Sequence, residues 1–145
     1  MFFAAYADEL DLPDEEWRRL ARGGDFVVFG LFDGERLVGI TGAFTHRDDP
    51  TGRTAVLGMT YLEPDYRGRR VSALMYGARL AWARAQRRFE RVVVSHRRAN
   101  VASGRAIARH GFTPTGVARR RWHDGTEDDE LLFELRLSTE PAATD

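Results

Sequence analysis

A strand, a basic turn and a long helix follow one another between residues 60 and 89, and this order constrains the fold more than any other part of the chain. Residues 54–62 are rich in β-forming types, and Pro64 ends the run. From Val71 onward, apolar residues recur at steps of three and four, which predicts one apolar stripe along a helix. The predicted stripe contains Leu74, Met75, Ala78, Trp82, Ala85 and Phe89, while the other surface carries Arg79, Arg84, Arg87 and Arg88. The stripe must be buried, and the strand-like runs on either side of it indicate a sheet as its partner.

The turn between this strand and this helix is a candidate anion site. Its residues are Arg67, Gly68, Arg69, Arg70, Val71 and Ser72. The start of a helix leaves backbone N–H groups unpaired and carries partial positive charge, so it attracts anions. We therefore expect the diphosphate of a nucleotide-like cofactor here. Considered without the rest of the chain, the same segment also fits a solvated helix cap or a nucleic-acid-binding patch.

Before this unit, the sequence predicts one helix and two strands. Residues 8–22 have acids in the first turn and arginines in the last, which is typical of a short helix. The β-type runs 25–31 and 36–45 are joined by Asp33-Gly34, a strong hairpin signal. Together with residues 54–62, these runs predict an antiparallel meander.

After this unit, the pattern changes from a buried strand to a helix and then to a strand pair. Residues 91–96 form a continuous apolar run that is typical of a parallel strand. A helix is expected from the N-cap Asn100 to the stop signal Gly111. Residues 115–122 and 130–137 are expected to pair, and residues 138–145 form a flexible tail.

Composition excludes several classes of function. The chain has 145 residues, a formal net charge of zero and no cysteine, and all 22 of its Lys and Arg positions are arginine. The missing thiols exclude disulfides, thiolate metal sites and a cysteine nucleophile, and we expect no metal site. Charge neutrality argues against a general nucleic-acid binder. Because no signal peptide or membrane-spanning run is recognisable, we predict a soluble cytoplasmic protein without a membrane partner.

Taken together, the basic turn and the segments after it resemble the GCN5-related N-acetyltransferase (GNAT) superfamily. The acetyl-CoA signature of that family, Gln/Arg-x-x-Gly-x-Gly/Ala, follows a strand and opens a long helix, as residues 67–72 do here. Arg67 matches the first position, whereas Arg70 stands where Gly is usual and Ser72 stands where Gly or Ala is usual. The predicted helix at residues 100–112 also resembles the family's second helix, which opens with Asn and closes with Gly-Phe.

The resemblance implies an α+β fold. We expect a mixed, mostly antiparallel sheet with a central parallel pair bridged by the helix at 71–89, and helices on both faces. Residues 1–137 form a single domain on this view. The family's usual first strand and helix are missing from the predicted order, so either the protein begins upstream or this is a shortened version. An edge strand would then be exposed, which makes a homodimer possible.

The resemblance also implies direct attack by a primary amine of a small molecule or peptide on the thioester of acetyl-CoA. It assigns three groups of residues to the cofactor. The backbone of Thr60, Tyr61 and Leu62 pairs with the pantetheine arm, and one N–H group faces the thioester oxygen. The phosphates lie on Arg67, Gly68, Arg69, Arg70, Val71 and Ser72. Asn100 and Ser103 lie beside the pantetheine arm.

The proton-transfer groups are less determined by the sequence. An alkylammonium group with a pKa of about 10 must lose a proton before it attacks. Glu63 and His96 are the candidate bases, because they lie at the ends of the two strands that flank the cofactor. The family's usual acid, a Tyr, has Ile107 at its position. Tyr66 or Tyr76 takes this role, or the thiolate gains its proton from water.

Several alternatives stay open. One is a non-catalytic acyl-CoA-binding or sensing module, because the signature Gly and the usual Tyr are replaced. Another is a nucleic-acid binder that uses the arginine clusters at 67–70, 84–91 and 119–121. The acidic cluster at 124–130 would attract a cationic acceptor, but a solvated hairpin tip explains it more simply. A solvated face is likewise favoured over substrate contact for Glu15, Glu16 and Trp17.

Overall fold

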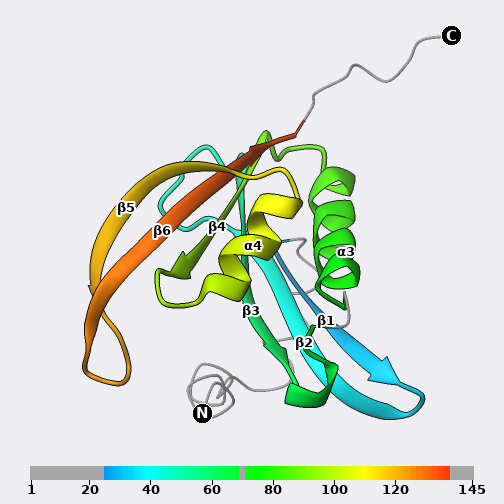
Figure 1. Ribbon diagram of the computed structural model, residues 1–145. Helices are drawn as coiled ribbons and strands as arrows, with labels where there is room; N and C mark the ends of the chain where they lie inside the picture. The colour runs from blue at the N-terminus through cyan, green and yellow to red at the C-terminus, as the bar shows by residue number, and fades with distance from the viewer. Residues whose placement is uncertain (1–24, 69–70, 138–145) are drawn as a thin grey trace, which may run out of the picture.

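The computed structural model describes residues 25–68 and 71–137 (Figure 1). Three of the predicted features lie outside the described residues. They are the helix at 8–22 with its candidate substrate contacts Glu15, Glu16 and Trp17, the pair Arg69 and Arg70, and the tail at 138–145.

In the described part of the chain, six strands form one sheet in the order β1-β2-β3-β4-β6-β5. The strands are β1 (Phe26–Asp33), β2 (Arg36–Thr45), β3 (Thr54–Leu62), β4 (Arg91–Arg97), β5 (Thr113–Arg121) and β6 (Glu127–Arg136). Every pair of neighbours is antiparallel except β3 and β4, which are parallel. This confirms the predicted mixed, mostly antiparallel sheet with a central parallel pair.

The turn between β1 and β2 follows from two residues. Asp33 pairs with Arg36, so the hairpin loop is only Gly34 and Glu35. Gly34 has a φ of 62°, a left-handed conformation that glycine adopts without steric cost and that two-residue hairpin turns require. The sequence signal at Asp33-Gly34 is therefore confirmed.

Two α-helices, α3 (Val71–Ala85) and α4 (Val101–Arg109), cover one face of this sheet (Figure 1). A short 3-10 helix, η1 (Pro64–Tyr66), precedes α3. One hydrophobic core joins both helices to the strands, and its central members are Ala43, Ala55, Leu57, Leu80, Ala83, Val92, Ala106 and Ile107. The third predicted helix, at residues 8–22, lies outside the described residues, so the expected helix on the other face stays a prediction. No helix in residues 25–68 and 71–137 is long and apolar enough to span a membrane.

The predicted apolar stripe of α3 is confirmed at Met75 but wrong at Leu74 and Ala85, which are exposed. The buried side chains are Met75, Tyr76, Arg79, Leu80 and Ala83. Leu74 is instead 66% exposed, whereas Arg79, which was assigned to the outer surface, is only 2% exposed. Phe89 is buried as predicted, but it lies beyond the helix, because α3 ends at Ala85 and Arg87 adopts a φ of 59°. Apolar spacing does not identify the buried face of α3 correctly, because that face includes an arginine.

Candidate functional site

The centre of the site is the place where β3 and β4 separate. Their parallel pairing covers only three residue pairs, the last of which is Val56 with Val93. Beyond this point β3 pairs with β2, and β4 pairs with β6. Among the described residues, no strand pairs with the edges of β3 and β4 that face each other beyond this point. An extended chain that enters between the two strands can pair with these edges as an added strand.

A β-bulge lies on the separated part of β3. The register against β2 shifts between Ile40 and Gly42, opposite residues 58–61. Met59 has a φ of 58°, which is uncommon for a residue with a side chain. Bulges turn backbone groups away from the regular ladder and occur often beside active sites. Here the bulge lies beside Thr60, the first of the β3 residues that the resemblance assigns to the cofactor.

The basic turn connects the end of β3 to the start of α3. Arg67 donates from its Nε to the carbonyl of Leu62 at 3.0 Å, and its guanidinium lies 6.0 Å from the centre of the Tyr61 ring. Gly68 has a φ of 77°, and apart from its chain neighbours no described atom lies within 4 Å of the place where a Cβ would be. The conformation, rather than a lack of space, therefore favours glycine at this position. The helix α3 begins at Val71, and Arg69 and Arg70 lie outside the described residues, so the anion site at this turn stays a prediction.

Glu63 lies at the carboxyl end of β3, as predicted, but its carboxylate is paired. Arg36 donates to Glu63 Oε2 at 2.5 Å. A second contact joins the same two segments, because the Tyr66 hydroxyl donates to Asp33 Oδ2 at 2.5 Å. This hydrogen bond raises the pKa of Tyr66 above its usual value. The turn of the β1–β2 hairpin is thus fastened to the loop that carries Glu63.

His96 lies near the end of β4 and is half-buried against α4. Its Nδ1 donates to the carbonyl of Arg97 at 2.7 Å, and its ring stacks on Phe133 with the centroids 5.4 Å apart. A Cβ built on Gly104 would lie 2.9 Å from both Nε2 and Cε1 of His96. The imidazole is therefore held between β6 and α4, with Nε2 at the helix surface.

The first turn of α4 is organised by Asn100. Its Oδ1 accepts a hydrogen bond from the backbone N–H of Ser103 at 3.2 Å, which confirms the predicted N-cap. Ile107, seven residues after Asn100, is 1% exposed and belongs to the core. Ile107 therefore presents no group for acid–base chemistry.

The other candidate acid, Tyr76, is also in the core. Its ring stacks on His110 with the centroids 4.2 Å apart and the planes at 15°. Burial raises the pKa of Tyr76 above its usual value. His110 ends α4 and donates from its Nδ1 to the carbonyl of Ala106 at 2.7 Å. Tyr76 therefore acts mainly as a packing residue between α3 and the end of α4.

A polar cluster that the sequence patterns did not predict lies beneath the bulge and consists of Arg79, Thr60 and Thr41. Arg79 donates from Nη1 to Thr60 Oγ1 at 3.3 Å and from Nε to the carbonyl of Met75 at 3.2 Å. The hydroxyl oxygens of Thr60 and Thr41 are 2.8 Å apart. The guanidinium also lies 4.5 Å from the centre of the Tyr76 ring. The spacing Met75, Arg79, Ala83 was the one sequence signal for this cluster, since it places Arg79 between two core positions.

The acidic cluster of the last hairpin is paired with arginines. Arg97 binds Asp124 at 2.9 Å and Asp128 at 3.2 Å, contacts the Thr126 hydroxyl and lies over the Trp122 ring. The remaining pairs join Arg98 to Asp129, Arg119 to Glu127 and Asp129, Arg120 to Glu130, and Arg121 to Glu127. These pairs neutralise both the acidic cluster and the arginines at 119–121. The hairpin is therefore a network of ion pairs rather than a free acidic patch.

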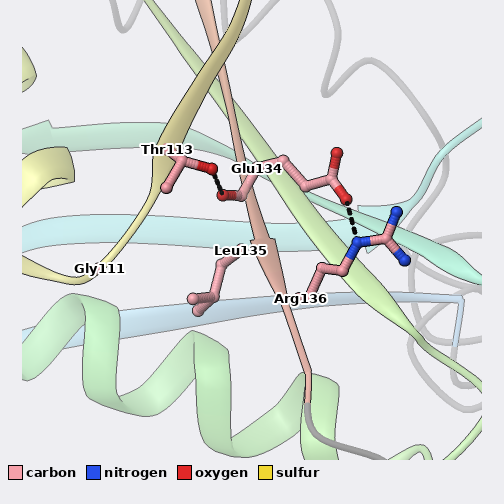
Figure 2. A pocket seen from close by; sticks show the side chains of 5 residues that line it. All are labelled: Gly111, Thr113, Glu134, Leu135 and Arg136. Carbon is pink, nitrogen blue, oxygen red and sulfur yellow. Dashed lines mark hydrogen bonds and ion pairs between the residues drawn. The ribbon is translucent and has the colours of Figure 1, made fainter.

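Two cavities lie at the other end of the sheet. Gly111, Thr113, Glu134, Leu135 and Arg136 line one of them (Figure 2). The Thr113 hydroxyl donates to the carbonyl of Glu134, and Arg136 contacts the Glu134 carboxylate at 3.3 Å. The second cavity is lined by Asp49, Thr51, Arg53, Thr54, Glu90, Arg91 and Arg136. Neither cavity includes a predicted site residue. In the described part of the chain, no group of His, Asp or Glu side chains could hold a metal ion.

Comparisons with known proteins agree with this geometry. Residues 1–112 match the Acetyltransferase (GNAT) family. An acetyltransferase of the GNAT family from Streptococcus pneumoniae is 16% identical with a TM-score of 0.74, and the match covers 83% of this chain and 72% of that one. The structure of yncA from Salmonella typhimurium with its cofactor acetyl-CoA is 19% identical with a TM-score of 0.74, covering 89% and 75%.

An N-acetyltransferase from Staphylococcus aureus Mu50 is 17% identical with a TM-score of 0.75, and the match covers 85% of this chain and 74% of that one. A search among curated proteins gave no match. At these identities the solved structures establish a shared fold, while the family match covers more than half of the sequence. The chain therefore belongs to the GNAT family of acetyltransferases.

Proposed function

We propose that the protein transfers an acetyl group from acetyl-CoA to a primary amine of a small molecule or peptide. The observation that carries this proposal is the separation of β3 from β4 beyond Val56, where β3 has a bulge at Met59 and leads into the glycine turn before α3. The bulge provides backbone donors at one point, and the turn provides an anion site a few residues later. A molecule with a thioester at one end and a diphosphate at the other matches this order.

Residues at both ends of the site would hold acetyl-CoA, as yncA from Salmonella typhimurium does in its structure. The backbone of Thr60, Tyr61 and Leu62 would pair with the amides of the pantetheine arm. The N–H groups at the start of α3, with Gly68 and Arg67, would bind the phosphates. Asn100 and Ser103 would border the arm from α4. Holding both reactants in line is a large part of catalysis in such a transfer.

Glu63 is the better of the two candidate bases. In the described residues its carboxylate contacts only Arg36, and it follows the strand that would hold the thioester. His96 has one nitrogen bound to the Arg97 carbonyl and the other against Gly104. We propose that Glu63 accepts the proton of the incoming amine, directly or through a water molecule, and that His96 mainly sets the distance between β4 and α4.

The first test is calorimetric titration with acetyl-CoA. Wild type is expected to bind in the micromolar range, and Arg67→Ala is expected to weaken the affinity roughly tenfold, as for the loss of a charged hydrogen bond. Arg47→Ala is the matched control, since Arg47 is an exposed arginine in the loop at the other end of β3. Absence of binding by the folded wild-type protein would contradict the proposal.

Catalysis is tested by the release of free CoA in the presence of a panel of primary amines. Glu63→Gln is expected to lower kcat by about 10²-fold or more, with the KM for acetyl-CoA nearly unchanged. His96→Gln should affect activity less. Tight binding without turnover for any amine would instead favour the alternative function, a non-catalytic acyl-CoA-binding module. The core position of Ile107 is the observation that supports this alternative.

The remaining expectations about partners and location are also proposals. We propose a cytoplasmic protein that binds neither nucleic acid nor membrane and is able to form a homodimer. The ion pairs of Arg119, Arg120 and Arg121 support the expectation that nucleic acid is not bound, because they leave fewer cations for a phosphate backbone. Light scattering tests whether the protein forms a homodimer, and a salt-dependent DNA-binding assay tests whether it binds nucleic acid.

A further inference from the structure

The cluster of Arg79, Thr60 and Thr41 has an unusual electrostatic composition. Arg79 and Thr41 are each only 2% exposed, while Thr60 is exposed on the part of β3 that is separated from β4. Among the described residues, no carboxylate forms an ion pair with Arg79, whose polar partners are the Thr60 hydroxyl, the Tyr76 hydroxyl and a main-chain carbonyl. Burial lowers the pKa of Arg79, although a guanidinium stays protonated in proteins.

A buried charge of this kind is costly for folding. Charged side chains are rarely buried unless they are paired, and removing one from water is costly even after the surrounding structure relaxes. An apolar side chain of similar volume would fill the same place at lower cost. The arginine at this position therefore contributes something other than stability.

Counting hydrogens shows where the Thr60 hydroxyl must point. Thr41 is buried, and Thr60 is the one described partner of its hydroxyl group, so the Thr41 proton is satisfied only if it points to Thr60 Oγ1. Arg79 has no acceptor and also donates to Thr60 Oγ1. The Thr60 oxygen then accepts two hydrogen bonds, and its own proton points outward, toward the edge of β3 that faces β4. Two donors on one oxygen polarise the outward O–H group and strengthen it as a donor.

We propose that the Thr60 hydroxyl donates a hydrogen bond to the thioester sulfur of the acyl donor, and that Arg79 and Thr41 are positioning residues that hold it in this orientation. This inference rests on the proposed function. Thr60 lies beside the bulge at Met59, so its side chain lies at the same point of β3 as the bulge.

The role of this hydrogen bond follows from the electron movements of the transfer. The amine nitrogen forms a bond to the acetyl carbon, the bond between that carbon and the sulfur breaks, and the sulfur leaves with the electron pair as a thiolate. The proton of the amine goes to the base, and the thiolate later gains a proton from water. The Thr60 hydroxyl keeps its own proton and stabilises the negative charge on the sulfur. It thereby supplies a donor that Ile107 cannot provide.

The test is a pH titration of the CoA complex, in which the ultraviolet absorbance of the thiolate reports the pKa of the bound thiol. A hydrogen bond to the charged form lowers that pKa, so wild type should hold it below the value of free CoA. Thr60→Val, which keeps the shape and removes the donor, should raise it, and Thr60→Ser should restore it. Arg79→Met should raise the pKa of the bound thiol as well, and Arg79→Lys should give a pKa between those of Arg79→Met and wild type.

The same variants are compared in turnover with the best amine of the panel. Thr60→Val is expected to lower kcat about ten- to hundredfold while the KM for acetyl-CoA changes less than about threefold, since the bond matters most after charge develops. Thr113→Val is the control, because it removes a strand hydroxyl at the far end of the sheet. Thermal unfolding establishes that each variant is folded.

Three results separate the possible failures. If folded Thr60→Val leaves both the pKa of the bound thiol and kcat at the wild-type values, the inference is overturned while the proposed function stands. If Thr60→Ser behaves like Thr60→Val, the hydroxyl is not the active feature and the inference again fails. If the wild-type protein binds neither CoA nor acetyl-CoA, both proposals are overturned.

Discussion

Two arginines near the centre of the sheet are held in opposite ways. Arg97, at the end of β4, contacts Asp124, Asp128 and the Thr126 hydroxyl, and these contacts raise its pKa. Arg79, on α3, is buried deeper, contacts hydroxyl and carbonyl groups, and has its pKa lowered by burial. An arginine held by carboxylates fastens two segments together. An arginine held only by neutral groups keeps its positive charge uncompensated, and this charge acts on its surroundings.

The largest expected difference between the two arginines is in activity. Arg79→Met should lower kcat about tenfold or more, because the Thr60 hydroxyl loses the donor that orients it. The free energy of unfolding should stay unchanged or rise by up to about 4 kcal/mol, because an apolar side chain replaces a buried charge. Steady-state kinetics and urea unfolding measure the two quantities on the same preparation. A large loss of stability together with normal kcat would mean that Arg79 is an ordinary structural residue.

The next largest effect is expected for the stability of the hairpin. Arg97→Met should lower Tm by several degrees, because Asp124 and Asp128 then lose their common partner. Added salt should narrow the difference between this variant and wild type, since exposed ion pairs are screened. Differential scanning calorimetry at low and high salt provides the measurement. Equal Tm values for Arg97→Met and wild type at low salt would mean that the ion pairs of Arg97 with the last hairpin do not stabilise the protein.

The same network predicts how stability depends on pH. Hydrogen bonds from Thr126 and Arg97 hold the pKa of Asp124 well below its usual value. A carboxyl group with a lowered folded-state pKa stabilises the protein above its unfolded pKa of about 3.9, and this contribution is lost as the pH falls toward the folded-state pKa. Asp124→Asn should therefore have a lower Tm than wild type at neutral pH. The two Tm values should converge as the pH falls below about 4.

A small coupling is expected between β4 and α4. Alanine usually stabilises the interior of a helix relative to glycine by about 1 kcal/mol, but a Cβ at Gly104 would meet the His96 ring at 2.9 Å. Gly104→Ala should therefore give little or no gain in wild type and about 1 kcal/mol in a His96→Ala background. A double-mutant cycle by chemical unfolding measures this coupling. Additive effects would mean that the imidazole is not held by the helix surface.

Sequence patterns predicted the sheet well because the strands depend on local signals. The hairpin at Asp33-Gly34, the apolar run at 91–96 and the N-cap at Asn100 each require only a few neighbouring residues. These features appear in the structure as predicted, and the family match confirms the resemblance that was based on the basic turn and the segments after it.

The buried face of α3 was not predictable from apolar spacing. Arg79 is buried because Thr60 and Thr41, 19 and 38 residues earlier in the chain, provide polar partners on neighbouring strands. The bulge at Met59 depends on the register between β2 and β3, which no short pattern specifies. The partner of Glu63 depends on how the first hairpin meets the loop before α3. These details are long-range, and they are also the details that shape the candidate site.

The short parallel pairing of β3 with β4 has a mechanical consequence. Only three residue pairs join the half of the sheet formed by β1, β2 and β3 to the half formed by β4, β6 and β5. Beyond Val56 and Val93 no described strand pairing joins the two halves, and only the shared core beneath α3 and α4 connects them there. A strand-like ligand bound between β3 and β4 would join the two halves of the sheet along the length of these strands. Occupancy of the site should then slow amide hydrogen exchange across the whole sheet, including strands that the ligand never touches.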